Sequence, residues 1–269
     1  MDLDLEGKVA LVSGGTKGCG LAIAAELARE GARVVVASRS RDNVEAAVAE
    51  IGAAGGQVRG VAADMTTPDG VAAAVETAHA AFGPPLIAIS NVNAPDGPTV
   101  ERPRWGFEDV SDEEFDTGYE VLVRSVVLLT RAVLPAMKAA RWGRLLNIGS
   151  KAVKVPHLPP SPMVLSNVGR MGAVGLMKDI SLEYGIYNVT ANVIATGAFA
   201  TTRSHAYFES RGLTIAEQEE NLRKAAIGVS RFGRPEEMGW LAAFLCSDRA
   251  AFISGEVIGI SGGMSVAMM

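Results

Sequence analysis

Short apolar runs alternate with longer segments of helical spacing along the whole chain. The runs are rich in Val, Ile and Ala, as expected for strands that are buried on both faces of a parallel sheet. They predict strands over Val9–Ser13, Arg33–Ser38, Gln57–Ala62, Leu86–Ser90, Gly143–Ile148, Val189–Ile194 and Glu256–Ile260. The intervening segments predict helices over Gly18–Glu30, Asp42–Ala53, Pro68–Phe82, Asp112–Ala140, Met163–Tyr184 and Pro235–Cys246.

This alternation predicts a single α/β domain over residues 1–269, built as a Rossmann-type, doubly wound parallel sheet of about seven strands flanked by helices. Ligands of such sheets bind at the carboxyl ends of the strands. Two segments break the rhythm, residues 95–106 and Thr201–Ala226, and the second carries helical spacing after a loop, as a substrate lid would. The proline-rich run Pro156–Pro162 is expected to form a stiff loop.

Composition and charge exclude several classes of partner. The net charge is −5 with no basic run, so we expect neither a nucleic-acid partner nor an anionic membrane surface. The acidic start MDLDLEGK does not resemble an export signal, and polar residues interrupt the longest uncharged stretch, Tyr184–Thr202. Two cysteines, Cys19 and Cys246, cannot build a disulfide framework or a metal site by spacing, so a cytoplasmic protein without a bound metal is expected.

A glycine-rich turn follows the first predicted strand. Gly14, Gly18 and Gly20 have G-x3-G-x-G spacing between that strand and the first predicted helix. Because they lack a Cβ atom, backbone N–H groups and the helix N-terminus could approach a pyrophosphate closely. The alternative is a tight turn that serves only helix packing. The position within a complete βαβ unit favours nucleotide binding.

The residues after the second predicted strand indicate which dinucleotide would bind. An acidic residue there would bind a free ribose 2′-hydroxyl, whereas this chain has Ser38-Arg39-Ser40-Arg41. Arg39 could pair with a 2′-phosphate, and Lys17 of the glycine turn could reach the same group. These side chains could instead be solvated surface charges. Their convergence on one ribose predicts NADP(H) as the cofactor.

Several motifs together resemble the short-chain dehydrogenase/reductase family. They are LEGKVALVSGGTKGCG at the start, Asp64 in VAADMTT, LTRAVLPAMKAARWGRLLNIGS, NVIATGAFATTR and FISGEVIGISGG. The resemblance implies that Asp64 contacts the adenine ring and that the long helices pack across a two-fold axis, giving a homodimer or homotetramer. The expected cofactor-binding set is Gly14, Thr16, Lys17, Gly18, Cys19, Gly20, Ser38, Arg39, Asp64, Met65, Asn91, Asn167, Gly197 and Thr201.

The resemblance also implies a catalytic tetrad of Asn, Ser, Tyr and Lys, from which this chain departs. Aligning on LLNIGS places the serine at Ser150, the tyrosine position at Met163 and the lysine position at Asn167, and the helix places the asparagine position at Leu122. A thioether cannot donate a proton, and an amide carries no charge that would lower a neighbouring pKa. No tyrosine has a lysine four or seven residues later; the tyrosines are Tyr119, Tyr184, Tyr187 and Tyr207.

Other residues could supply part of the missing chemistry. Ser150 keeps its place and could bind a substrate oxygen, although a turn serine would look the same. His157, in the proline-rich loop, is a competent acid near neutral pH, although a lone histidine is often structural. Arg170 lies three residues after Asn167 on the same helix and could anchor an anionic substrate or serve a subunit interface; the residues favour the interface.

Two functions follow from these features. The first is an atypical NADPH-dependent oxidoreductase that transfers hydride to a small carbonyl, imine or activated-alkene substrate without the usual tyrosine acid. The second is a non-redox protein on the same scaffold, either a lyase, isomerase or cyclase or a cofactor-binding regulatory module. The intact glycine turn favours the first, and the empty tetrad positions favour the second.

Overall fold

The computed structural model describes residues 2–92, 106–156, 163–224 and 228–265. Seven parallel strands form one sheet in the order β3-β2-β1-β4-β5-β6-β7. The strands are β1 (Val9–Ser13), β2 (Arg33–Ser38), β3 (Val58–Ala62), β4 (Ile87–Ser90), β5 (Gly143–Ile148), β6 (Val189–Thr196) and β7 (Val257–Ile260). The predicted single-domain, doubly wound α/β fold is confirmed, and the strand bounds differ from those predicted by at most two residues.

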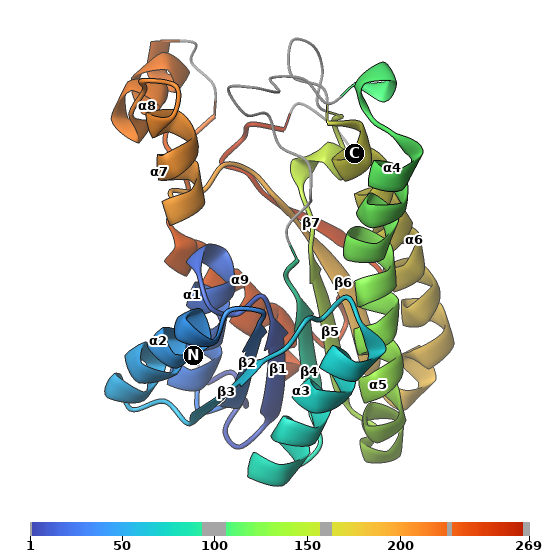
Figure 1. Cartoon of the computed structure of the whole chain (residues 1–269). Coiled ribbons are helices and arrows are strands. Elements are labelled where there is room, and N and C mark those ends of the chain that lie inside the picture. Colours follow the sequence, from blue (N-terminus) through green and yellow to red (C-terminus); the bar gives the residue numbers. More distant parts are fainter. Residues whose placement is uncertain (1, 93–105, 157–162, 225–227, 266–269) are drawn as a thin grey trace.

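Helices cover both faces of the sheet (Figure 1). The helices outside the lid segment are α1 (Gly18–Arg29), α2 (Arg41–Ala53), α3 (Pro68–Ala81), α4 (Asp112–Tyr119), α5 (Ser125–Ala140), α6 (Val164–Tyr184) and α9 (Pro235–Cys246). One hydrophobic core lies between the sheet and α1, α2 and α9, and a second lies between the sheet and α3, α5 and α6. The sheet is therefore buried on both sides, which explains why its strands read as continuous apolar runs.

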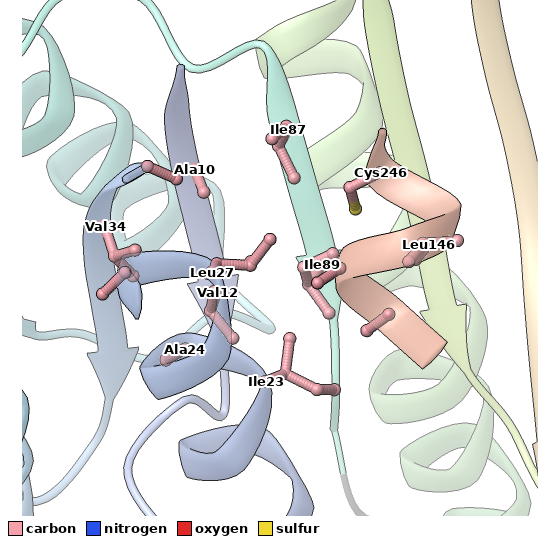
Figure 2. Close-up of a cluster of buried hydrophobic side chains, with 14 of the residues drawn as sticks. Ala10, Val12, Ile23, Ala24, Leu27, Val34, Ile87, Ile89, Leu146 and Cys246 are labelled. Carbon is pink, nitrogen blue, oxygen red and sulfur yellow. The ribbon is translucent and has the colours of Figure 1, made fainter. Parts of the chain in front are cut away.

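Figure 2 shows part of the first core, where α1 and α9 meet over β1 and β4. Ile23 and Leu27 of α1 pack with Val12 of β1 and Ile89 of β4, and all four side chains are fully buried. Cys246 of α9 belongs to the same cluster. Burial raises the pKa of its thiol to about 12, so Cys246 is a protonated, apolar packing residue at neutral pH.

The sheet order reverses direction between β1 and β4. The chain runs from β1 outward to β2 and β3, then returns to pair β4 with the other edge of β1, with Ser13 opposite Ser90 at their carboxyl ends. Helices on opposite faces leave a crevice at such a switch point. The glycine turn Gly14–Gly20 follows β1 directly and lies at this place.

One predicted helix is interrupted. The segment Asp112–Ala140 contains α4, a wide π-helical turn over Glu120–Arg124, and α5. The Ser125 hydroxyl donates to the carbonyl oxygen of Val121 at 2.6 Å, a bond to the preceding turn that competes with the regular ladder. Leu122 is buried in this turn, and a Cβ atom on Gly169 of α6 would approach the Leu122 side chain to 2.8 Å. The wide turn therefore packs directly on α6.

The segment predicted as a lid contains two short helices, α7 (Thr202–Glu209) and α8 (Ile215–Lys224). They stand at the top of the molecule in Figure 1, on the opposite side from α4. Thr201 caps α7, because its hydroxyl accepts from the N–H of Ser204 at 3.3 Å. Within the described ranges, no helix has both the length and the apolarity needed to cross a membrane.

The buried side chain of Arg144 links the ends of three elements by hydrogen bonds. The Arg144 side chain of β5 is fully buried; it donates to the carbonyl oxygens of Ser247, Gly143 and Asn188 at 3.3, 2.9 and 3.1 Å. Its Nη2 also donates to Asp248 at 2.8 Å. These contacts link the start of β5 to the residues before β6 and after α9. Desolvation lowers the pKa of Arg144, and the charge of Asp248 acts against that effect.

We expect Arg144→Leu to lower the free energy of unfolding by about 3 kcal/mol, because it leaves Asp248 without its cationic partner and several buried carbonyl oxygens without their donor. Urea unfolding followed by circular dichroism measures the loss. Arg131→Leu, on the exposed side of α5, is the matched control and should stay within about 0.5 kcal/mol of the parent. Equal urea concentrations at the unfolding midpoints of the two variants would contradict the structural role of Arg144.

Candidate functional site

The glycine turn is held against the end of β4 by contacts that exclude side chains. Gly14 and Gly18 have φ angles of +65° and +53°, which favour glycine. A Cβ atom on Gly14 would collide with the carbonyl oxygen of Asn91, and one on Gly20 would collide with the carbonyl oxygen of Gly14. The Asn91 amide donates to the Gly14 carbonyl at 3.0 Å. The turn, α1 and the end of β4 are thereby locked together.

The N-terminus of α1 opens toward this turn. Its N-cap residue, Lys17, forms no side-chain capping hydrogen bond, and the first turn of the helix contains no acidic residue. The first N–H groups of a helix have no partner within the helix, and the helix dipole adds partial positive charge there. This end of α1 is therefore suited to an anion such as a pyrophosphate.

Two adjoining grooves run along the carboxyl ends of the strands. The lid groove, with a volume of about 590 Å³, extends from the glycine turn to the ends of β5 and β6 and to α7. The edge groove, with a volume of about 550 Å³, extends over the ends of β2 and β3. Both grooves share Gly14, Ser38, Asn91, Val92 and Arg203.

Most of the predicted cofactor-binding residues line these grooves. The lid groove is lined by Gly14, Thr16, Lys17, Gly18, Cys19, Ser38, Asn91, Gly197 and Thr201. The edge groove adds Arg39, Asp64 and Met65. Gly20 packs against Gly14, because a Cβ atom at position 20 would collide with the Gly14 carbonyl oxygen. The absence of a side chain there allows the tight turn. These residues follow five different strands, and the fold brings them together at the carboxyl edge of the sheet.

The edge groove carries an ionised carboxylate beside a cation. Asp64 accepts from the N–H of Thr66 at 2.9 Å and from its hydroxyl at 2.7 Å. The backbone hydrogen bond is the main cause that lowers the pKa of Asp64; the Thr66 hydroxyl and the charge of Arg39 act in the same direction, against partial burial. Ser13 also lines this groove, and its buried hydroxyl has no hydrogen-bond partner among the described residues. A polar ligand would satisfy it.

The ionisable side chains of the lid groove are biased toward positive charge. Its lining includes Lys17, Arg170 and Arg203, and no Asp or Glu from the described part of the chain. The one other titratable group, the Cys19 thiol, has its pKa raised to about 11, chiefly by burial, so it stays protonated at neutral pH. In a protein of net charge −5, the charges of this groove are suited to an anion.

Arg170, expected to anchor an anionic substrate or to serve a subunit interface, lies at the lid groove. Its Nη1 donates to the carbonyl oxygen of Ile148 at 3.1 Å, and the side chain lines the lid groove. Arg203, in the first turn of α7, lines both grooves and was not identified from the sequence. The sequence signals for Arg203 were its place at the start of the lid segment and at the end of the motif NVIATGAFATTR.

The predicted reaction-centre residues lie near the end of β5 and the start of α6. The Ser150 hydroxyl accepts from the N–H of Ala152 at 3.2 Å and so caps a short turn. Met163 precedes α6, and the N–H of Asn167 donates to its carbonyl oxygen at 3.0 Å. Among the described lining residues of the two grooves, Ser150, Met163 and Asn167 do not occur. The predicted acid, His157, lies outside the described residues.

None of the four tyrosines belongs to the described lining of either groove. Tyr119 at the end of α4 is exposed. Tyr184 and Tyr187 lie together at the opposite end of α6, with ring centroids 6.3 Å apart, and Tyr207 of α7 contacts the ring of Phe208. The residues that the structure describes also contain no group of three His, Cys, Asp or Glu side chains that could hold a metal ion.

Comparison with known proteins gives consistent matches over the whole chain. The model of the enoyl-(acyl carrier protein) reductase family matches residues 14–265. Dehydrogenase/reductase SDR family member 4 of Oryctolagus cuniculus is 34% identical over 260 residues, 96% of this chain and 94% of that protein. The 3-oxoacyl-[acyl-carrier-protein] reductase FabG of Pseudomonas aeruginosa is 32% identical and covers 97% of this chain and 99% of its own length.

A solved structure agrees with these relatives. The L-sorbose reductase of Gluconobacter frateurii, complexed with NADPH and L-sorbose, has a TM-score of 0.87 and 30% sequence identity, with 100% of both chains covered. Sequence and fold therefore match along the same residues that form the sheet and the grooves. The chain belongs to the short-chain dehydrogenase/reductase family of oxidoreductases.

Proposed function

We propose that this protein is an NADPH-dependent oxidoreductase that reduces a small carbonyl, imine or activated-alkene substrate without a tyrosine acid. The observation that carries the proposal is the pair of grooves that meet at the uncapped N-terminus of α1. Together they offer a continuous path for a dinucleotide, with an anion site near its middle. Bound NADPH would supply the hydride.

The residues of the grooves suit each part of that cofactor. The edge groove would hold the adenine-side half, with Asp64 and Met65 beside the ring and Ser13 offering a buried hydroxyl. The glycine turn and the N-terminus of α1 would bind the pyrophosphate through backbone N–H groups. Thr201 of the lid faces the same turn, since a Cβ atom on Gly18 would approach its methyl group to 3.2 Å. The lid helices would exclude water from the bound nucleotide.

The choice of NADPH over NADH rests on the end of β2. Arg39 lines the edge groove next to Ser38, where an acidic residue would favour a free 2′-hydroxyl, and Lys17 lines the adjoining groove. Both side chains are exposed, so they could turn toward a phosphate without losing an existing buried contact. The L-sorbose reductase similar to this chain was solved with NADPH, which supports the same choice.

We expect NADPH to bind at least about tenfold more tightly than NADH, because a charge-assisted phosphate–arginine pair contributes about 1.5–3 kcal/mol. Fluorescence titration of the reduced nicotinamide measures both affinities. Arg39→Ala should remove most of the preference, whereas Arg41→Ala, a neighbouring exposed arginine outside the groove linings, should retain it. Equal affinities of the parent protein for the two nucleotides would refute the assignment.

The proton for the reduced substrate would come from His157, since none of the chain's tyrosines belongs to the described groove linings. Ser150 would position the substrate oxygen by a hydrogen bond, without donating the proton itself. An iminium ion or conjugated alkene would need less help from an acid than a ketone, because a positioned hydride donor already supplies proximity. The atypical site therefore favours substrates that are activated by their own chemistry.

His157→Ala should lower kcat by about a hundredfold with unchanged NADPH affinity, because general acid catalysis typically contributes that much and the proposed acid would act on the substrate and not on the nucleotide. Activity of the parent should fall as the pH rises through about 6.5, the ordinary imidazole value. Steady-state rates between about pH 5 and 9 measure both effects. His79→Ala, at an exposed position of α3, is the matched control. An unchanged kcat would show that the proton comes from elsewhere.

The competing function is non-redox chemistry or regulation on the same scaffold, and it rests on Met163 and Asn167 at the positions of the usual Tyr and Lys. Incubation of the purified protein with NADPH and a panel of ketones, imines and enones separates the two, with loss of reduced-nicotinamide absorbance as the readout. Turnover on any member supports hydride transfer. If only the Met163→Tyr/Asn167→Lys double variant turns over, the native role is not hydride transfer.

The assembly is expected to be a symmetric dimer or tetramer. Helix α6 exposes Val168, Met171 and Leu182, with 57%, 49% and 72% of their surface accessible, and Tyr119 of neighbouring α4 is also exposed. An apolar face of this kind is unusual on an isolated monomer and suits a two-fold contact. Light scattering at micromolar concentration should give at least twice the chain mass, and Val168→Asp should shift it toward the monomer. A monomeric parent would rule this out.

A further inference from the structure

Arg170 is held in a defined orientation on α6. Its side chain runs back toward the N-terminus of the helix, as helical side chains do, and its Nε donates to the Ser166 hydroxyl at 3.1 Å. Its Nη1 donates to the carbonyl oxygen of Ile148, the last residue of β5, at 3.1 Å. Ser166 and Ile148 are both buried. The two bonds therefore place the guanidinium at the carboxyl end of β5.

Arg170 lies away from the part of the site where the adenine half of the proposed dinucleotide would bind. Arg39 and Asp64 line the edge groove at β2 and β3, and the glycine turn follows β1. A dinucleotide that starts there and crosses the turn reaches the ends of β4, β5 and β6. Arg170 lines this part of the lid groove, together with Gly149 and Thr196.

The surroundings of the guanidinium define what it can bind. The described lining of the lid groove contains no carboxylate, and Thr196 directs its hydroxyl to the carbonyl oxygen of Gly149 at 2.9 Å. Asn167, one turn before Arg170, is neutral and does not belong to that described lining. Arg170 therefore brings a positive charge to the end of the groove at β5. A guanidinium is a planar donor group that suits hydroxyl, carboxylate and phosphate oxygens.

We propose that Arg170 holds the nicotinamide-side half of the bound dinucleotide, through hydrogen bonds from its guanidinium to the ribose oxygens next to the nicotinamide. The proposal rests on the proposed cofactor. It gives Arg170 a binding role that the family resemblance would place at Asn167. Because a guanidinium stays protonated, its contribution to binding stays constant between about pH 6 and 9.

The test compares two ligands by isothermal titration calorimetry. NADPH contains both halves of the dinucleotide, whereas adenosine 2′,5′-bisphosphate contains only the adenine side. Arg170→Met should weaken NADPH binding about tenfold or more and leave adenosine 2′,5′-bisphosphate binding unchanged, because only NADPH reaches position 170. Arg170→Lys, which keeps the charge, should recover part of the lost affinity. Arg131→Met, an exposed arginine of α5, should bind both ligands like the parent.

Each other outcome has a distinct meaning. Unchanged NADPH affinity in Arg170→Met, or equal weakening of both ligands, would overturn the proposal, the second because it indicates damage to the whole site. Arg170→Lys binding NADPH as weakly as Arg170→Met would also overturn it. If Arg170→Met does not fold, Arg170→Lys must still weaken NADPH selectively. A parent protein that binds neither ligand would instead refute the proposed cofactor, and the role of Arg170 with it.

Discussion

The site depends on the close approach of two backbone segments at the point where the sheet reverses direction. Gly14 and Gly20 leave no room for a Cβ atom, and the Asn91 amide bonds the Gly14 carbonyl across the gap between β1 and β4. This contact aims the N-terminus of α1 at the carboxyl edge of the sheet. The crevice, the direction of the helix dipole and the two grooves all follow from it.

Charge is distributed along that edge in a way that the overall composition does not suggest. The chain carries a net charge of −5, yet the charged residues described in the lid groove are Lys17, Arg170 and Arg203. Each comes from a different element: the glycine turn, α6 and the first lid helix. Asp64, at the far end of the edge groove, is kept ionised mainly by hydrogen bonds from Thr66. The fold thus gathers cations along the groove that we propose for the dinucleotide.

Much of the fold and the tight glycine turn could be predicted from the sequence, because both depend on local patterns. Buried parallel strands read as apolar runs, and a turn that requires glycine shows its glycines directly. The π-helical turn at Glu120–Arg124 was missed, since it results from the Ser125 hydroxyl bonding to the preceding turn and from packing of Leu122 on Gly169. Helical periodicity alone does not distinguish such a turn from a continuous helix.

The direction in which a long side chain points could not be predicted from the sequence either. Spacing placed Arg170 near Asn167 on one helix face, but only the bonds to Ile148 and Ser166 show that its guanidinium turns toward the groove. A crystal structure of the protein with NADPH tests the central claim most directly. We expect the 2′-phosphate beside Arg39, the pyrophosphate over the Gly14–Gly20 turn and the nicotinamide ribose against Arg170. A nucleotide bound elsewhere, or in the opposite direction along the grooves, would contradict it.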